Sequence, residues 1–86
     1  MEKAEVTMGI DPFNTIKKAL AKAKKPVKLK KAVSLSYDEE ADVLYVKFSY
    51  SKIVDNEALD DNGLILASLD SKENVVGLTI MEASTL

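Results

Sequence analysis

Carboxylates in the stretch YDEEADVLYVKFS, residues 37–49, are the first groups in this chain whose type and spacing suggest chemistry. Four acids stand directly before an apolar run: Asp38, Glu39, Glu40 and Asp42. A second pair, Asp60-Asp61, follows later in the chain. If the fold brought the two clusters together, their carboxylates would have the chemistry of a divalent-metal site or of the paired acids of a glycosidase. Their spacing matches neither a calcium-binding loop nor a zinc site.

The alternative is that both clusters form solvated turns. Asp38 and Asp42 stand where a hairpin must reverse, and an Asp carboxylate accepts hydrogen bonds from nearby backbone N–H groups. The second pair precedes Asn62-Gly63, a strong turn dipeptide. We favour the turn interpretation and predict no catalytic residue, cofactor or metal site. The enzyme or metal hypothesis would use four residues: Asp38, Asp42, Asp60 and Asp61.

Composition restricts the chemistry further. The chain has no His, which is the usual general base at neutral pH and the commonest metal ligand. It has no Cys, so thiol catalysis and thiolate metal sites are absent, and its twelve basic residues are all Lys. A cysteine-free chain is compatible with a reducing compartment, and we expect a cytoplasmic location. No apolar run approaches the ~20 residues that a transmembrane helix needs.

Charge divides the 86 residues into two unlike parts. Residues 1–31 carry nine Lys against three acids, a net charge of +6, whereas residues 32–86 carry three Lys against eleven acids, a net charge of −8. The basic part is either an arm for an anionic partner or a helix that docks on its own acidic sheet.

The elements that must position these charges begin with a basic amphipathic helix over residues 11–25. Asp11 is the expected N-cap, Pro12 the first helical residue, and Pro26 the stop. An apolar stripe follows at helical period: Phe13, Ile16, Ala19, Leu20 and Ala23. Lys18, Lys22 and Lys25 lie opposite this stripe. Residues 1–10 are expected to be a flexible N-terminus.

After Pro26 the apolar period changes to two, which predicts strands. We expect a small antiparallel β-domain over residues 27–84, with strands near 33–37, 43–50, 63–69 and 75–81. Residues 53, 54 and 59 could add a short edge strand. The predicted fold class is therefore α+β, an N-terminal amphipathic helix followed by an antiparallel β-meander of about four strands, in a single domain.

Alternation assigns the strand residues to two faces. The predicted core face is formed by Val33, Leu35, Tyr37, Leu44, Val46, Phe48, Val76, Leu78 and Ile80. The opposite side presents a possible oligomer face of Val43, Tyr45, Leu64, Leu66, Val75 and Met81. This second set is too apolar to face water as one patch, and so small a chain gains from sharing a core. We therefore expect a homo-oligomer, with a dimer favoured.

Three segments resemble a known family. They are residues 37–46, YDEEADVLYV, residues 63–66, GLIL, and residues 76–84, VGLTIMEAS. The tyrosine-aspartate turn that leads into an alternating strand resembles the small prokaryotic family called domain of unknown function 2283. The resemblance covers about residues 32–84 and implies a compact antiparallel β-domain with no established reaction or site residues. The basic helix departs from the usual short form.

Four functional hypotheses follow. The first is an uncharacterised non-catalytic module that self-associates and binds a protein partner, as a regulatory protein would. The second is nucleic-acid binding, in which eight lysines neutralise phosphates: Lys17, Lys18, Lys22, Lys24, Lys25, Lys28, Lys30 and Lys31. The third is a helix on an anionic membrane surface. The fourth is the enzyme or metal protein, and we favour the first.

Overall fold

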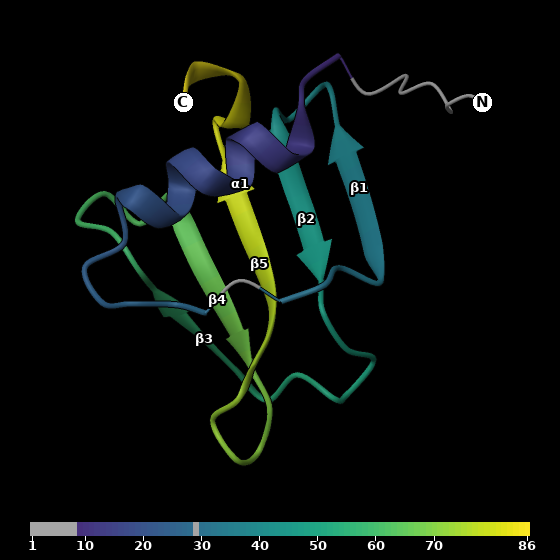
Figure 1. Cartoon of the computed structure of the whole chain (residues 1–86), viewed down its shortest axis with the longest axis vertical. Coiled ribbons are helices and arrows are strands. Elements are labelled where there is room, and N and C mark those ends of the chain that lie inside the picture. The colour runs from purple at the N-terminus through teal and green to yellow at the C-terminus, as the bar shows by residue number, and fades with distance from the viewer. Residues whose placement is uncertain (1–8, 29) are drawn as a thin grey trace.

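The computed structural model describes residues 9–28 and 30–86. One helix precedes a five-stranded antiparallel sheet, and a short 3₁₀ helix closes the chain (Figure 1). The elements are α1 (Pro12–Ala21), β1 (Ser34–Asp38), β2 (Val43–Lys47), β3 (Asp55–Ala58), β4 (Ile65–Leu69), β5 (Val75–Met81) and η1 (Ala83–Thr85). This confirms the α+β class and adds β3 to the four main predicted strands.

Helix α1 starts as its sequence predicts and ends earlier. The Asp11 carboxylate accepts a hydrogen bond from the Asn14 N–H at 3.2 Å, and Pro12 occupies the first turn. The helix ends at Ala21, whereas the predicted helix runs to residue 25. The reason is tertiary, because the Lys24 N–H donates to the Leu59 carbonyl at 2.7 Å and draws this segment toward the sheet.

The start of the chain also differs in part from the prediction. Of the predicted flexible residues 1–10, the first eight lie outside the described residues. Ile10 packs against the hydrophobic core.

The strand order is β1-β2-β5-β4-β3, so the sheet is not a simple meander. Three hairpins join β1 to β2, β3 to β4 and β4 to β5. The long connection after β2 leads to the far edge, and β5 returns to pair with β2. The two edge strands of the sheet are therefore β1 and β3.

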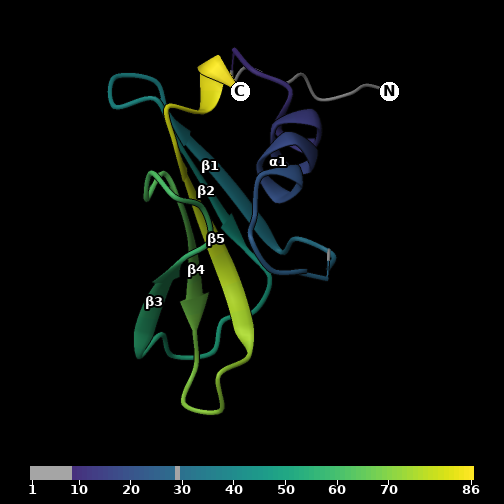
Figure 2. The ribbon, with the colours of Figure 1, turned by 90° about the vertical axis from the view of Figure 1, so that its left-hand side faces the viewer.

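One face of the sheet packs against α1, as Figure 2 shows. Ile16 and Ala19 of the helix are buried there, whereas Phe13 of the predicted stripe is 64% exposed. On this face, neighbouring strands place side by side the residues that alternation assigns to the core, for example Tyr37 opposite Leu44. The buried core is completed by residues of β2, β4 and β5, by the residues directly after β2 and β3, and by one residue of η1: Leu44, Val46, Phe48, Leu59, Ile65, Ala67, Leu78, Ile80 and Ala83.

Two predicted core residues do not belong to this face. Val33 precedes β1 and is 48% exposed. Val76 is buried but does not join the core cluster, while Val75, predicted on the opposite face, packs against the core. The cause is a β-bulge, because Ser68 pairs with Gly77 but Leu69 pairs with Val75. The extra residue, Val76, shifts the alternation at the start of β5.

Candidate functional site

The acidic stretch after β1 forms a turn. The Asp38 carboxylate accepts hydrogen bonds from the backbone N–H groups of Glu40 at 3.1 Å and Ala41 at 3.2 Å. The side chains of Glu39 and Glu40 are exposed. Asp38 thus has the local role that the turn interpretation predicts.

Asp42 has a tertiary role, because it joins the β1–β2 turn to the C-terminal end of the chain. Its carboxylate accepts hydrogen bonds from the Tyr37 hydroxyl at 2.6 Å, the Ser84 hydroxyl at 2.7 Å and the Ser84 N–H at 3.0 Å. Its carbonyl accepts a fourth from the Ala83 N–H at 3.0 Å. We call Tyr37, Asp42 and Ser84 the clasp. The first two lie in the predicted motif, but no local pattern in the sequence links them to Ser84.

The electrostatics of the clasp follow from these bonds. The hydrogen bond from Tyr37, followed by that from the Ser84 hydroxyl, lowers the pKa of Asp42 below its ordinary value. The hydrogen bond to Asp42, together with partial desolvation and the nearby carboxylates, raises the pKa of Tyr37 to about 12. A carboxylate with a lowered pKa is a poor base, and a phenol of pKa about 12 is a poor acid near neutral pH. The clasp is therefore better suited to holding the β1–β2 turn against the C-terminal segment than to proton transfer.

This network predicts a pH dependence of stability at both extremes. Because the pKa of Asp42 is lowered on folding, its contribution is present above its ordinary pKa of 3.8 and is lost as the pH falls through the lower value. Because the pKa of Tyr37 is raised, its contribution is present below pH 10.0 and is lost as the pH rises toward about 12. Thermal unfolding across the pH range should show both losses.

Two variants separate these contributions. Asp42→Asn should flatten the acid loss, and Tyr37→Phe should remove a tyrosinate absorbance step near pH 12. Unchanged acid and alkaline profiles in both variants would contradict the clasp.

The second acidic pair is also engaged within the chain. The Asp60 carboxylate accepts hydrogen bonds from the N–H groups of Leu64 and Ile65, each at 3.0 Å, which closes the β3–β4 turn. Asp61 forms an ion pair with Lys24. No group of three or more potential metal ligands occurs in residues 9–28 and 30–86. The four acids of the enzyme hypothesis thus lie in turns and are not brought together as a metal site within this range.

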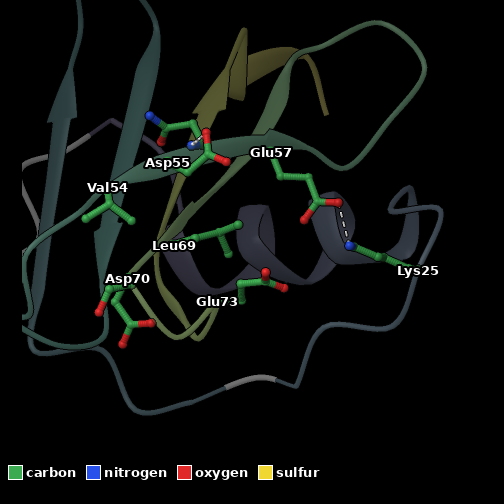
Figure 3. Close-up of a pocket in the computed structure, with 9 residues that line it drawn as sticks. Lys25, Val54, Asp55, Glu57, Leu69, Asp70 and Glu73 are labelled. Carbon is green, nitrogen blue, oxygen red and sulfur yellow. Dashed lines mark hydrogen bonds and ion pairs between the residues drawn. The ribbon is translucent and has the colours of Figure 1, made fainter.

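A further hollow, of about 580 Å³, lies between β3 and the β4–β5 turn (Figure 3). Several carboxylates surround it, but the structure gives three of them partners within the chain. The Asp55 carboxylate accepts a hydrogen bond from the Asn56 N–H at 2.8 Å. Glu57 forms an ion pair with Lys25. Asp70 accepts hydrogen bonds from Asn74 and Lys72, and the backbone N–H of Asn74 is the main cause of its lowered pKa. This hollow is an open surface around a turn.

Four of the eight predicted anion-binding lysines contact other groups of the chain. All eight are exposed: Lys17, Lys18, Lys22, Lys24, Lys25, Lys28, Lys30 and Lys31. Lys24 and Lys25 pair with acids of the sheet region. Lys18 donates to the Leu86 carbonyl at 3.1 Å, and Lys30 to the Val75 carbonyl at 3.2 Å. Half of the set therefore contacts the chain itself, as expected for a basic segment that docks on its own acidic sheet.

The face of the sheet turned away from α1 is the third candidate, and we call it the open face. The strand pairing arranges its side chains in three rows across the strands. The first row is Asp38, Val43, Met81 and Leu64. The second is Ser36, Tyr45, Thr79, Leu66 and Ala58. The third, more polar, is Ser34, Lys47, Gly77, Ser68 and Asn56.

The first two rows hold the predicted oligomer face except for Val75, which the bulge moves to the core side. Tyr45 is 46% exposed, and Leu64, Leu66 and Met81 are each partly accessible. In Figure 2 no helix covers this side. Apolar side chains are thus gathered on the side of the sheet that α1 leaves bare.

A shallow hollow of about 380 Å³ lies on the open face. Tyr45, Ile53, Ser68, Val76 and Thr79 are among the residues that line it. Ile53, in the connection after β2, is itself 46% exposed. The hollow has the mixed apolar and hydroxyl lining that can accept a side chain from another protein surface.

The fold and the motif residues define a class of small antiparallel β-domain. A family model described as protein of unknown function (DUF2283) matches residues 34–84. The chain belongs to this family, as the motifs suggested. The match starts at β1 and includes all three clasp residues, but not α1. Neither the curated proteins nor the solved structures gave a match. Among the described residues, no helix has the length and apolar character needed to span a membrane.

Proposed function

We propose that this protein is a non-catalytic module that associates with itself through the open face and acts as a protein-interaction or regulatory unit. The observation that carries this proposal is the difference between the two faces of the sheet. One packs against α1, while the other presents the row that holds Tyr45 and Leu66, and no helix lies over that side in Figure 2. Covering such a face is a large source of association free energy.

The polar residues support the same proposal. The clasp joins distant parts of the chain, the acidic turns have local structural roles, and the chain lacks His, Cys and Arg. A cytoplasmic location remains part of the proposal and rests on the cysteine-free composition.

Nucleic-acid binding through the Lys-rich segment 17–31 has weaker support. Lys24 and Lys25 are engaged by Asp61 and Glu57, so binding phosphates there would require giving up internal ion pairs. Such binding would be strongly salt-dependent. A titration with duplex or single-stranded oligonucleotides at low and moderate salt tests it, and measurable low-salt affinity that falls steeply with salt would favour it over our proposal.

We expect light scattering coupled to size exclusion to give at least twice the chain mass of 9.4 kDa at micromolar concentration. Leu66→Lys should lower that mass, because Leu66 lies in the middle of the open face and an ammonium desolvated there is penalised. Since Leu66 is only partly buried within one chain, circular dichroism should show that the variant can still fold.

Asn56→Lys, outside β1 and outside the hollow on the open face, is the matched control. It places the same charge on the same face, but in the polar third row and at an exposed position. This variant should keep the parent mass. A folded Leu66→Lys variant with the mass of the parent would contradict association through the open face.

A further inference from the structure

The two edge strands of the sheet differ in how they are protected. Unpaired edges invite pairing with another chain, and proteins usually block them with charges, prolines or bulges. Edge strand β3 has the sequence DNEA and is guarded by Asp55 and Glu57. Edge strand β1 has the sequence SLSYD, in which the one charged residue is Asp38 at the end of the strand, and its register against β2 is uninterrupted. Within the described residues, no other strand pairs with its outer side. The β1 edge is therefore the less protected of the two and the one more open to pairing with another strand.

The segment around β1 also has opposite charges at its two ends. Exposed Lys28, Lys30 and Lys31 precede the strand, and the exposed acids Asp38, Glu39 and Glu40 end it or follow it. An antiparallel arrangement of two such segments places the basic end of each beside the acidic end of the other. The charge pattern is thus complementary to a second copy of itself.

We propose that the β1 edges of two copies pair antiparallel about a two-fold axis at Ser36, which joins the two five-stranded sheets into one continuous sheet. In this register Leu35 of each copy lies opposite the partner's Tyr37. Lys31 extends toward the partner's Glu39 and Glu40, and Lys30 joins it by giving up its bond to the Val75 carbonyl. The occupant of the edge is a second copy of this chain.

An apolar groove beside the same edge supports this assignment. It has a volume of about 300 Å³ and lies between α1 and the approach to β1. Phe13, Ile16, Leu35 and Phe48 line it, and Lys17, Lys30 and Lys31 stand around it. Phe13 is 64% exposed although it belongs to the apolar stripe of the helix. Edge pairing brings the partner's Tyr37 beside Leu35, at the border of this groove.

The inference rests on the proposed self-association and adds a second surface to it. The two surfaces are separable, since β1 is an edge and Leu66 lies in the middle of the open face. An association that depends on Leu66 alone, or on β1 alone, can therefore be recognised.

The first test uses the absence of cysteine from the chain. Across the proposed axis the two Ser36 Cβ atoms would lie about 4.5–5.5 Å apart, close enough for a disulfide after small adjustments. Ser36→Cys should form a covalent dimer under mild oxidation at micromolar concentration. Ser71→Cys, exposed in the β4–β5 turn and outside both proposed surfaces, is the matched control and should remain largely monomeric on a denaturing gel. Equal cross-linking of both variants, or of Ser71→Cys alone, would overturn the register.

The second test exchanges the charges. A variant with Lys30→Glu and Lys31→Glu, and one with Glu39→Lys and Glu40→Lys, should each show a dimer dissociation constant raised tenfold or more in sedimentation analysis. Mixing the two should restore association as a heterodimer, which native mass spectrometry detects when one chain carries ¹⁵N. Lys52→Glu, exposed in the connection after β2, is the control for charge alone and should behave as the parent.

The outcomes separate the two surfaces. If both charge variants and their mixture associate as the parent does, the edge proposal fails while association through Leu66 can stand. If Leu66→Lys keeps the parent mass while the mixture shows charge rescue, the open-face proposal fails and the edge proposal is supported.

Discussion

Replacing Phe48 by Ala is expected to lower the free energy of unfolding by about 3–5 kcal/mol. Phe48 follows the last residue of β2, is only 9% exposed and belongs to the core cluster on the helix side of the sheet. Its backbone N–H donates to the Val76 carbonyl at 2.8 Å, which holds this part of the backbone against β5. Truncation therefore removes buried apolar surface and leaves a cavity that the surrounding strands cannot easily close. Chemical denaturation followed by circular dichroism measures the change.

Tyr50 supplies the control because it is an aromatic residue two positions further on and 75% exposed. Its ring lies 5.5 Å from the Lys47 ammonium, a contact worth about 0.5–1 kcal/mol at an exposed site. Tyr50→Ala should therefore cost about 1 kcal/mol or less. Equal losses for the two variants would mean that Phe48 is not a core residue.

The placement of Phe48 in the core is an example of what the sequence could predict, namely which side chains of residues 43–48 face the core. Alternation over 43–48 leaves two choices, and only one of them buries Leu44 and Val46 while exposing Lys47. The structure confirms that choice, with Val46 opposite Leu35 and Leu78. The capping of α1 was equally predictable, because Asp11 and Pro12 act within a single turn.

The features that sequence reasoning missed depend on contacts between distant segments. At the start of β5, Val75 and Val76 are equally apolar, so no pattern reveals which residue is the bulge. Helix α1 ends at Ala21, before the proline signal, because of the bond from Lys24 to Leu59. Nor does alternation specify which strands are neighbours, so the pairing of β2 with β5 required the structure.

The candidate sites likewise include features that a local sequence pattern predicts and features that depend on distant contacts. The turn roles of Asp38 and Asp60 were predicted, because an Asp carboxylate bonds to backbone groups only a few residues away. The partnership of Asp42 with Ser84 spans 42 positions and has no local signal. The open face was largely predicted, since it is the complement of the core face, and its single exception is Val75 at the bulge.

Gly77 is the second position at which a single substitution should have a large effect. Gly77 lies in β5, which pairs with β2 on one side and β4 on the other. A Cβ atom at this position would stand 2.8 Å from the Val46 carbonyl oxygen and 3.8 Å from the Ser68 Cβ. The first distance is a steric overlap with backbone, which cannot rotate away as a side chain can.

Gly77→Ala is therefore expected to lower the free energy of unfolding by about 1–3 kcal/mol through overpacking. An opposing effect is the smaller conformational entropy of Ala in the unfolded chain, which favours the variant by about 0.4–1 kcal/mol at unstrained positions. The overlap should outweigh it, because relief requires β5 to move relative to a neighbour that is held along a whole strand. Denaturation measurements on Gly77→Ala and the parent decide whether the substitution lowers or raises the free energy of unfolding.

Thr79→Ala provides the comparison, since Thr79 lies two residues further along β5 on the same face and is partly accessible. It should cost clearly less than Gly77→Ala. A Gly77→Ala variant as stable as the parent would show that the close approach to Val46 is absent. The position also bears on association, because Gly77 is among the residues lining the hollow on the open face. A methyl group there reduces the space for a partner's side chain, so a folded Gly77→Ala variant should also associate more weakly than Thr79→Ala.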